Sequence, residues 1–210
     1  MKKKIIFIVC LCSLLFAGMM VHASGENALF YRFGKILHSS ENKEENSSYR
    51  DTIVYSCKDF DISSAELQKM TDVFSLRGDE NAENAALQYI LERETIYHEA
   101  THSGISVSDE ELRSYCDNIR KELEDAENLE EVKSLYAAFG GEETYWKEMT
   151  EVYRKAYVIS KYWEEKQTDY EAKLPQTMDP EEKYDRWTLE QARITADLIE
   201  AEGMKKVVNP

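Results

Sequence analysis

Basic residues are scarce in this chain of 210 residues, which carries 26 Lys and Arg against 41 Asp and Glu. Its formal net charge at neutral pH is therefore −15. Without residues 1–23, which contain three Lys and no acid, 23 basic and 41 acidic residues remain, a net charge of −18. A surface of this sign repels phosphate backbones and anionic lipid head groups, so we predict no nucleic-acid partner.

Cysteine is also scarce, with four residues in all, and Cys10 and Cys12 lie in an apolar N-terminal segment. Cys57 and Cys116 are the two in the rest of the chain. In an exported protein this pair can form one disulfide that closes a long loop. Two buried, reduced thiols fit the sequence equally well, because spacing along the chain gives no distance between them.

Strand-forming stretches and enzyme motifs are few. Thr52–Cys57 is the one stretch rich enough in β-branched and aromatic residues to predict a strand, and we expect it to pair with Leu29–Phe33 as a small hairpin. The sequence has neither a Gly-rich phosphate-binding loop nor a Ser/His/Asp arrangement typical of a hydrolase. We therefore predict no enzymatic activity, no cofactor and no small-molecule substrate.

The first 23 residues have the three parts of a secretory signal. Lys2–Lys4 are followed by an apolar run over 5–21 and by a short sequence that ends at Ala23, where we expect cleavage. The apolar run is shorter than the ~20 residues that span a bilayer, so membrane contact is expected only if the segment stays uncleaved. Cys10 and Cys12 come too early for a lipid-anchored cysteine. We predict a secreted or extracytoplasmic protein of the cell envelope.

Helical periodicity dominates from Ser63 onward, so the predicted fold class is mostly α. Capping boxes at Ser63 with Glu66 and at Ser108 with Glu111 predict two helix starts, and Gly104 predicts the end of a helix. The expected division is a signal peptide over 1–23, a leader with a flexible polar loop over 24–51, a helical domain over 52–170, a linker over 171–179 and a C-terminal helix over 180–203 that folds back onto the domain.

His98, Glu99 and His102 have the H-E-x-x-H spacing of zinc hydrolases. On a helix the two His side chains point the same way, and the Glu between them can activate a zinc-bound water. The extended form of this motif fails, because Ile105 and Ser108 stand where a Gly and a third His are required. We therefore predict no metal site, and we keep a zinc-dependent hydrolase as the alternative.

Aromatic side chains recur at helical spacing along residues 142–170. Tyr145, Trp146, Tyr153 and Tyr157 are either core residues or the lining of a groove that takes apolar side chains of a partner. We name these four as candidate peptide-binding residues.

One stretch resembles a known family. Ala86-Leu87, Ile90-Leu91, Glu99-Ala100, Gly104-Ile105 and Val107–Leu112 are similar to the N-terminal chaperone domain of the SurA and PrsA family of exported folding factors. The likeness extends over about residues 52–165, and Asp61–Leu67 stands where that family has a strand leading into its first helix.

The resemblance implies a multi-helix chaperone domain with a small N-terminal strand or hairpin and a returning C-terminal helix. Residues 166–183 are too few for the parvulin domain that many members carry, so prolyl isomerase activity is expected to be absent. The implied function is binding of unfolded or extended polypeptide clients through an apolar helical groove. Besides the zinc hydrolase, a cell-surface module for one dedicated partner remains an alternative.

Overall fold

The structure is a computed structural model that describes residues 26–38, 52–125 and 128–207. The predicted signal peptide and the polar part of the predicted leader lie outside these residues. Within them the chain forms seven helices and one three-stranded sheet, so the predicted mostly α fold class is confirmed. None of these helices is both long and apolar enough to cross a bilayer.

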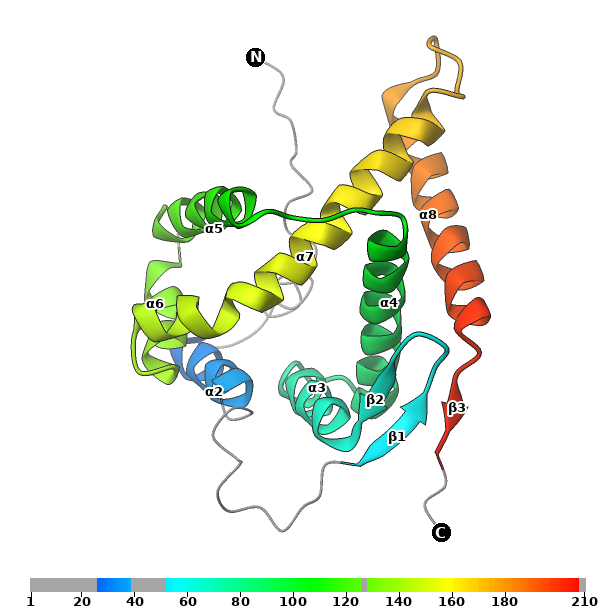
Figure 1. Ribbon diagram of the computed structural model, residues 1–210. Coiled ribbons are helices and arrows are strands. Elements are labelled where there is room, and N and C mark those ends of the chain that lie inside the picture. The colour runs from blue at the N-terminus through cyan, green and yellow to red at the C-terminus, as the bar shows by residue number, and fades with distance from the viewer. Residues whose placement is uncertain (1–25, 39–51, 126–127, 208–210) are drawn as a thin grey trace.

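The helices follow one another along the chain, and the strands of one small sheet come from two places, between α2 and α3 and after α8 (Figure 1). They are α2 (Glu26–His38), α3 (Ser64–Leu76), α4 (Ala82–His102), α5 (Asp109–Glu124), α6 (Leu129–Ala138), α7 (Glu142–Glu171) and α8 (Pro180–Glu202). The strands are β1 (Ile53–Ser56), β2 (Asp61–Ser63) and β3 (Lys205–Lys206), and they form a single sheet in the order β2-β1-β3.

The predicted hairpin partner of β1 is wrong. Leu29–Phe33 lies in helix α2, and β1 pairs antiparallel with β2 and β3 instead. Phe30 and Phe33 are three residues apart, which places both on one helical face, and both are buried. This face packs against α6 so closely that a Cβ on Gly34 would lie 2.6 Å from the Cβ of Ala138.

The predicted helix boundaries around the corner between α4 and α5 are confirmed. Gly104 follows α4 with a φ of +85°, a conformation that favours glycine. Ser108 and Glu111 form a complete capping box at the start of α5. At the start of α3 the side chain of Ser63 accepts the amide hydrogen of Glu66, whose carboxylate pairs with Arg93 of α4.

α7 is the central element, and α4, α5, α6 and α8 all pack against it. In Figure 1 it runs as a long yellow-green helix across the molecule. Its middle residues are buried although they point in different directions around the axis: Ala156, Val158, Ile159, Ser160 and Tyr162. Burial on several sides explains why the periodicity of this helix is less amphipathic than that of a surface helix.

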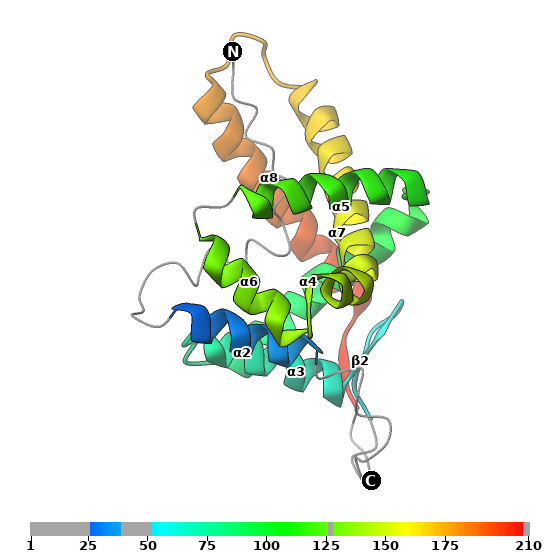
Figure 2. The same cartoon turned by 90° about the vertical axis from the view of Figure 1, so that its left-hand side faces the viewer.

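The C-terminal half of α7 and the N-terminal half of α8 form an antiparallel hairpin that extends away from the other helices (Figures 1 and 2). We call this hairpin the arm, residues 163–190. Trp187 of α8 is buried in it, with its ring 6.0 Å from that of Trp163 and 5.8 Å from that of Tyr170. Beyond the arm, α8 returns to the body and packs on α4, as the predicted folding-back of the C-terminal helix requires.

Candidate functional site

Three of the four aromatic residues predicted to bind peptide are in the core. Tyr145, Trp146 and Tyr153 are exposed by only 1%, 6% and 3%, and the hydroxyl oxygens of the two tyrosines lie 2.6 Å apart. Tyr157 is half-buried and stacks on Tyr115 with 4.3 Å between ring centroids. These rings hold α5, α6 and α7 together, and in this conformation the first three present no surface to a client.

A cation covers the outer side of this aromatic cluster. The guanidinium of Arg120 in α5 lies 4.8 Å from the ring centroid of Trp146, and Trp146 donates its indole hydrogen to Glu142 at 3.2 Å. Burial is the main cause that raises the pKa of neighbouring Tyr136 to about 12. The cluster is therefore a packed joint between helices.

The H-E-x-x-H residues pack against the turn between β1 and β2. The ring of His98 stacks on Phe60 with centroids 5.5 Å apart, whereas His102 is exposed, with its Nδ1 3.9 Å from a carboxylate oxygen of Asp59. Glu99 accepts the hydroxyl hydrogen of Ser103 at 3.4 Å. Among the residues that the structure describes, no three His, Cys, Asp or Glu side chains converge as metal ligands.

The same turn is held by the last residue of α8. Glu202 is buried, its carboxylate accepts the amide hydrogen of Asp59 at 3.1 Å, and its carbonyl accepts that of Lys58 at 3.0 Å. This contact brings the C-terminal end of α8 onto the sheet, and β3 then extends the sheet at β1. His98, His102 and Glu202 therefore all contact the turn between β1 and β2.

Cys57 and Cys116 are free thiols, so of the two alternatives that the sequence left open the structure has two reduced thiols. Cys57 lies in the turn after β1 and Cys116 in α5, and both views show α5 apart from the sheet (Figures 1 and 2). Burial is the main cause that raises the pKa of the Cys57 thiol to about 11, and burial also raises the pKa of Cys116.

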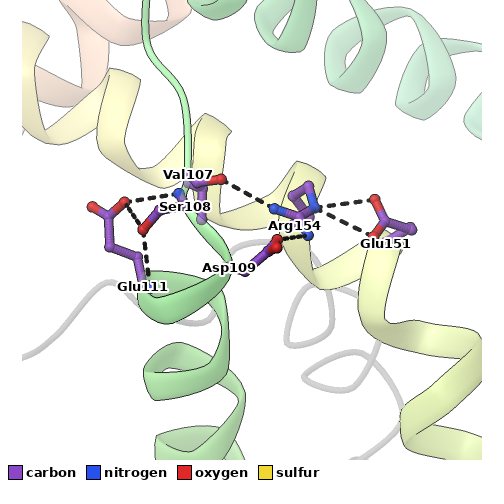
Figure 3. A network of polar contacts seen from close by, with 6 residues as sticks. All are labelled: Val107, Ser108, Asp109, Glu111, Glu151 and Arg154. Atoms are coloured by element: carbon purple, nitrogen blue, oxygen red, sulfur yellow. Dashed lines mark hydrogen bonds and ion pairs between the residues drawn. The ribbon is translucent and has the colours of Figure 1, made fainter.

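The corner that carries the family resemblance is clamped onto α7 (Figure 3). Arg154 donates to the carbonyl of Val107 at 3.0 Å, to the carboxylate of Asp109 at 2.8 Å and to that of Glu151 at 3.1 Å. One guanidinium thus joins the extended segment before α5 and the first residue of α5 to the central helix.

A second cation, Lys161, repeats this arrangement about two turns further along α7. Lys161 donates to Glu111 at 2.9 Å and to the carbonyl of Ser106 at 3.0 Å. Hydrogen bonds from the Ser108 amide, from Lys161 and from the Ser108 hydroxyl lower the pKa of Glu111 to about 2. The corner is therefore a fixed joint in this structure.

The arm carries the most exposed large apolar side chains of the described residues. Leu189 is 72% exposed and Tyr184 is 50% exposed, whereas Val152 on the body is 39% exposed. Leu189 lies on the side of α8 opposite to the buried Trp187. Sequence periodicity places Tyr184 and Trp187 on the apolar stripe of this helix. It does not identify Leu189 as a candidate, and the one sign in the sequence is that this apolar residue lies outside the stripe.

We define the outer face of α8 as five exposed residues at intervals of three or four. They are Asp185, Leu189, Ala192, Ala196 and Glu200. An interval of three or four residues brings side chains to one side of a helix, so these five form a continuous line along α8.

The charges along this face are unbalanced. Arg186 pairs with Glu182 at 2.8 Å, and Arg193 pairs with Glu190 at 2.7 Å and with Asp197. Both guanidinium groups near the face are therefore already neutralised by acids of α8 itself. Within the described part of the chain, neither Asp185 nor Glu200 has an ion-pair partner, so the face is apolar in its middle and negative at its ends.

Comparisons with protein families, with curated proteins and with solved structures gave no match for this chain. The similarity to the SurA and PrsA family therefore stays a prediction from the sequence.

Proposed function

We propose that this protein is an exported, chaperone-like binder of unfolded or extended polypeptide segments and that the arm carries its contact surface. The protein acts by reversible binding and performs no covalent chemistry. Its contact residues are Leu189 and Tyr184 of α8, in place of the aromatic residues of α7 that the sequence suggested.

One observation carries the proposal: the two most exposed large apolar side chains among the described residues lie five positions apart on the same projecting hairpin. A single exposed Leu is ordinary on a protein surface. Two such residues on an element that extends from the body give a client segment access from several directions.

The interior of the arm supports this role. Trp187 fills the space between α7 and α8 and contacts the rings of Trp163 and Tyr170, so the two helices are joined by large apolar surfaces. Because the arm is held from within, its outer residues are presented on a stiff scaffold, and less order is lost when a client binds.

The acidic surface supports the same role. A formal net charge of −15 keeps the protein and its complexes apart by repulsion while apolar segments are held. The basic and apolar N-terminal sequence supports export of the chain. The proposed clients are therefore exported chains with exposed apolar segments.

Suppression of aggregation tests the proposal. The full chain is mixed with several unrelated unfolded proteins, and light scattering is followed with and without Leu189→Gln. We expect the wild-type chain to suppress scattering for all of them and Leu189→Gln to be weaker. Val152→Gln is the matched control, because it removes an exposed apolar side chain from the body.

Two outcomes would overturn the proposal. If the chain suppresses the aggregation of none of these proteins, the general binding function is wrong. If Leu189→Gln and Val152→Gln both retain full suppression, the arm is not the contact surface. Circular dichroism of each variant checks that the helices are intact.

A further inference from the structure

We infer that the outer face of α8 docks a helical segment of a partner polypeptide that is apolar along one stripe and carries Lys or Arg at both ends of that stripe. The inference rests on the proposed function and names the class of segment that α8 holds, from the arm to the C-terminal half of the helix. Spacing, exposure and charge carry it together.

The spacing fits helix-on-helix packing. Leu189, Ala192 and Ala196 follow one another at intervals of three and four residues, the pattern of a seam along which a second helix lies. The two alanines let another backbone approach closely. Leu189, one turn before Ala192, projects from the same face toward the partner. From Asp185 to Glu200 the face is about 22 Å long, which matches a partner helix of about four turns.

The charges select the partner. Asp185 and Glu200 stand at the two ends of the apolar seam, and neither has an ion-pair partner within the described residues. Glu181, one turn before Asp185, adds a third such carboxylate. A helix with Lys or Arg at matching positions would neutralise these groups while its apolar stripe covers Leu189.

A second copy of this chain fits the face poorly. In an antiparallel pair of α8 helices, Asp185 would face Glu200 of the other copy. In a parallel pair each acid would face its own equivalent. Both arrangements place carboxylates against carboxylates, and repulsion between like charges disfavours them. The same negative charge repels an anionic membrane surface.

Designed peptides provide the probes. The first is an amphipathic helix of about 18 residues with a Leu and Ala stripe and Lys at both of its ends. The second has Glu in place of every Lys, and the third has the composition of the first in scrambled order. Each labelled peptide is titrated with the full chain, and fluorescence anisotropy gives the dissociation constant.

We expect the Lys peptide to bind at least about tenfold more tightly than the Glu peptide and than the scrambled peptide. Raising the ionic strength from about 0.05 M to about 0.5 M should weaken the Lys peptide and bring the two patterned peptides closer together.

Charge-matched variants assign the effect to the face. Asp185→Asn with Glu200→Gln should weaken the Lys peptide about threefold to tenfold. Glu83→Gln with Glu122→Gln removes the same charge from exposed positions of α4 and α5, and it should leave the affinity nearly unchanged. Leu189→Gln should weaken binding about tenfold without altering charge.

The outcomes separate this inference from the proposed function. Suppression of aggregation together with equal binding of the Lys and Glu peptides, or equal effects of the two double variants, overturns the inference and leaves the proposed function standing. Binding to vesicles of phosphatidylglycerol in preference to the Lys peptide also overturns it. Failure to suppress aggregation and to bind any peptide overturns both.

Discussion

The ammonium group of Lys155 in α7 lies 2.6 Å from the carboxylate of Glu94 in α4, a residue that is only 7% exposed. Arg93 contacts the same carboxylate and also that of Glu66 in α3, so one row of alternating charges joins three helices. Burial acts to raise the pKa of Glu94, but the charges of Arg93 and Lys155 outweigh burial, and the pKa lies below its ordinary value.

Removing one partner from this row should destabilise the fold. Lys155→Met leaves the buried carboxylate of Glu94 with Arg93 alone, and we expect the free energy of unfolding to fall by about 1–3 kcal/mol. Urea denaturation measures the change. Lys147→Met, at an exposed position of the same helix, is the control and should lie close to wild type. Equal stability of the two variants would show that the contact contributes nothing net.

Acidification should weaken the same joint. The pKa of Glu94 is lower in the folded than in the unfolded chain, so its contribution is complete above the ordinary value of 4.5 and is lost as the pH falls through the folded value. We expect the free energy of unfolding to decline as the pH falls below 4.5, and to decline less steeply in Glu94→Gln. Denaturation midpoints across the acid range test this. Parallel curves for wild type and variant would contradict it.

Adding one methyl group at the contact of α2 with α6 should also destabilise the protein. A Cβ at position 34 would lie 2.6 Å from the Cβ of Ala138 and 3.0 Å from the carbonyl oxygen of Leu135. We expect Gly34→Ala to cost about 1–3 kcal/mol, since gains in helix propensity are outweighed by overpacking. Lys35→Ala, next in the chain and exposed, should change thermal stability little. A stabilised Gly34→Ala protein would mean that the two helices separate readily.

Both described thiols should react slowly and independently. The pKa of Cys57 is raised to about 11, so at pH 8 only about one molecule in a thousand carries the thiolate that attacks iodoacetamide. We expect slow alkylation of Cys57 and Cys116 in the native chain and fast alkylation in urea, read by peptide mass spectrometry. Alkylation of both that occurs only after a reductant is added would point to a disulfide.

Mutation of the H-E-x-x-H motif should alter packing without releasing metal. We expect His98→Ala to lose the stacking contact with Phe60 and to destabilise the chain by about 0.5–1.5 kcal/mol. His102→Ala, at an exposed position, should be close to neutral. Metal analysis of a chain purified without chelator should find no stoichiometric zinc. One equivalent of zinc that is lost in both variants would restore the hydrolase hypothesis.

The candidate site was only partly predictable from residue types. The aromatic stripe of α7 was visible, but whether Tyr145, Trp146 and Tyr153 are core or surface depends on α5 and α6 covering them. Leu189 carried no local signal beyond its position outside the apolar stripe. Exposure belongs to the assembled molecule, since periodicity identifies a face and does not say what covers it.

The sequence by itself determined several of the places where a helix begins or ends. The caps at Ser63 with Glu66 and at Ser108 with Glu111, and the turn at Gly104, act within one turn of their own position, so neighbouring residues suffice to predict them. Only the tertiary structure decided that Leu29–Phe33 is a helix, that the sheet forms from β1, β2 and β3, and that Cys57 and Cys116 stay apart. These features depend on contacts between segments far apart in the chain, which local preference does not encode.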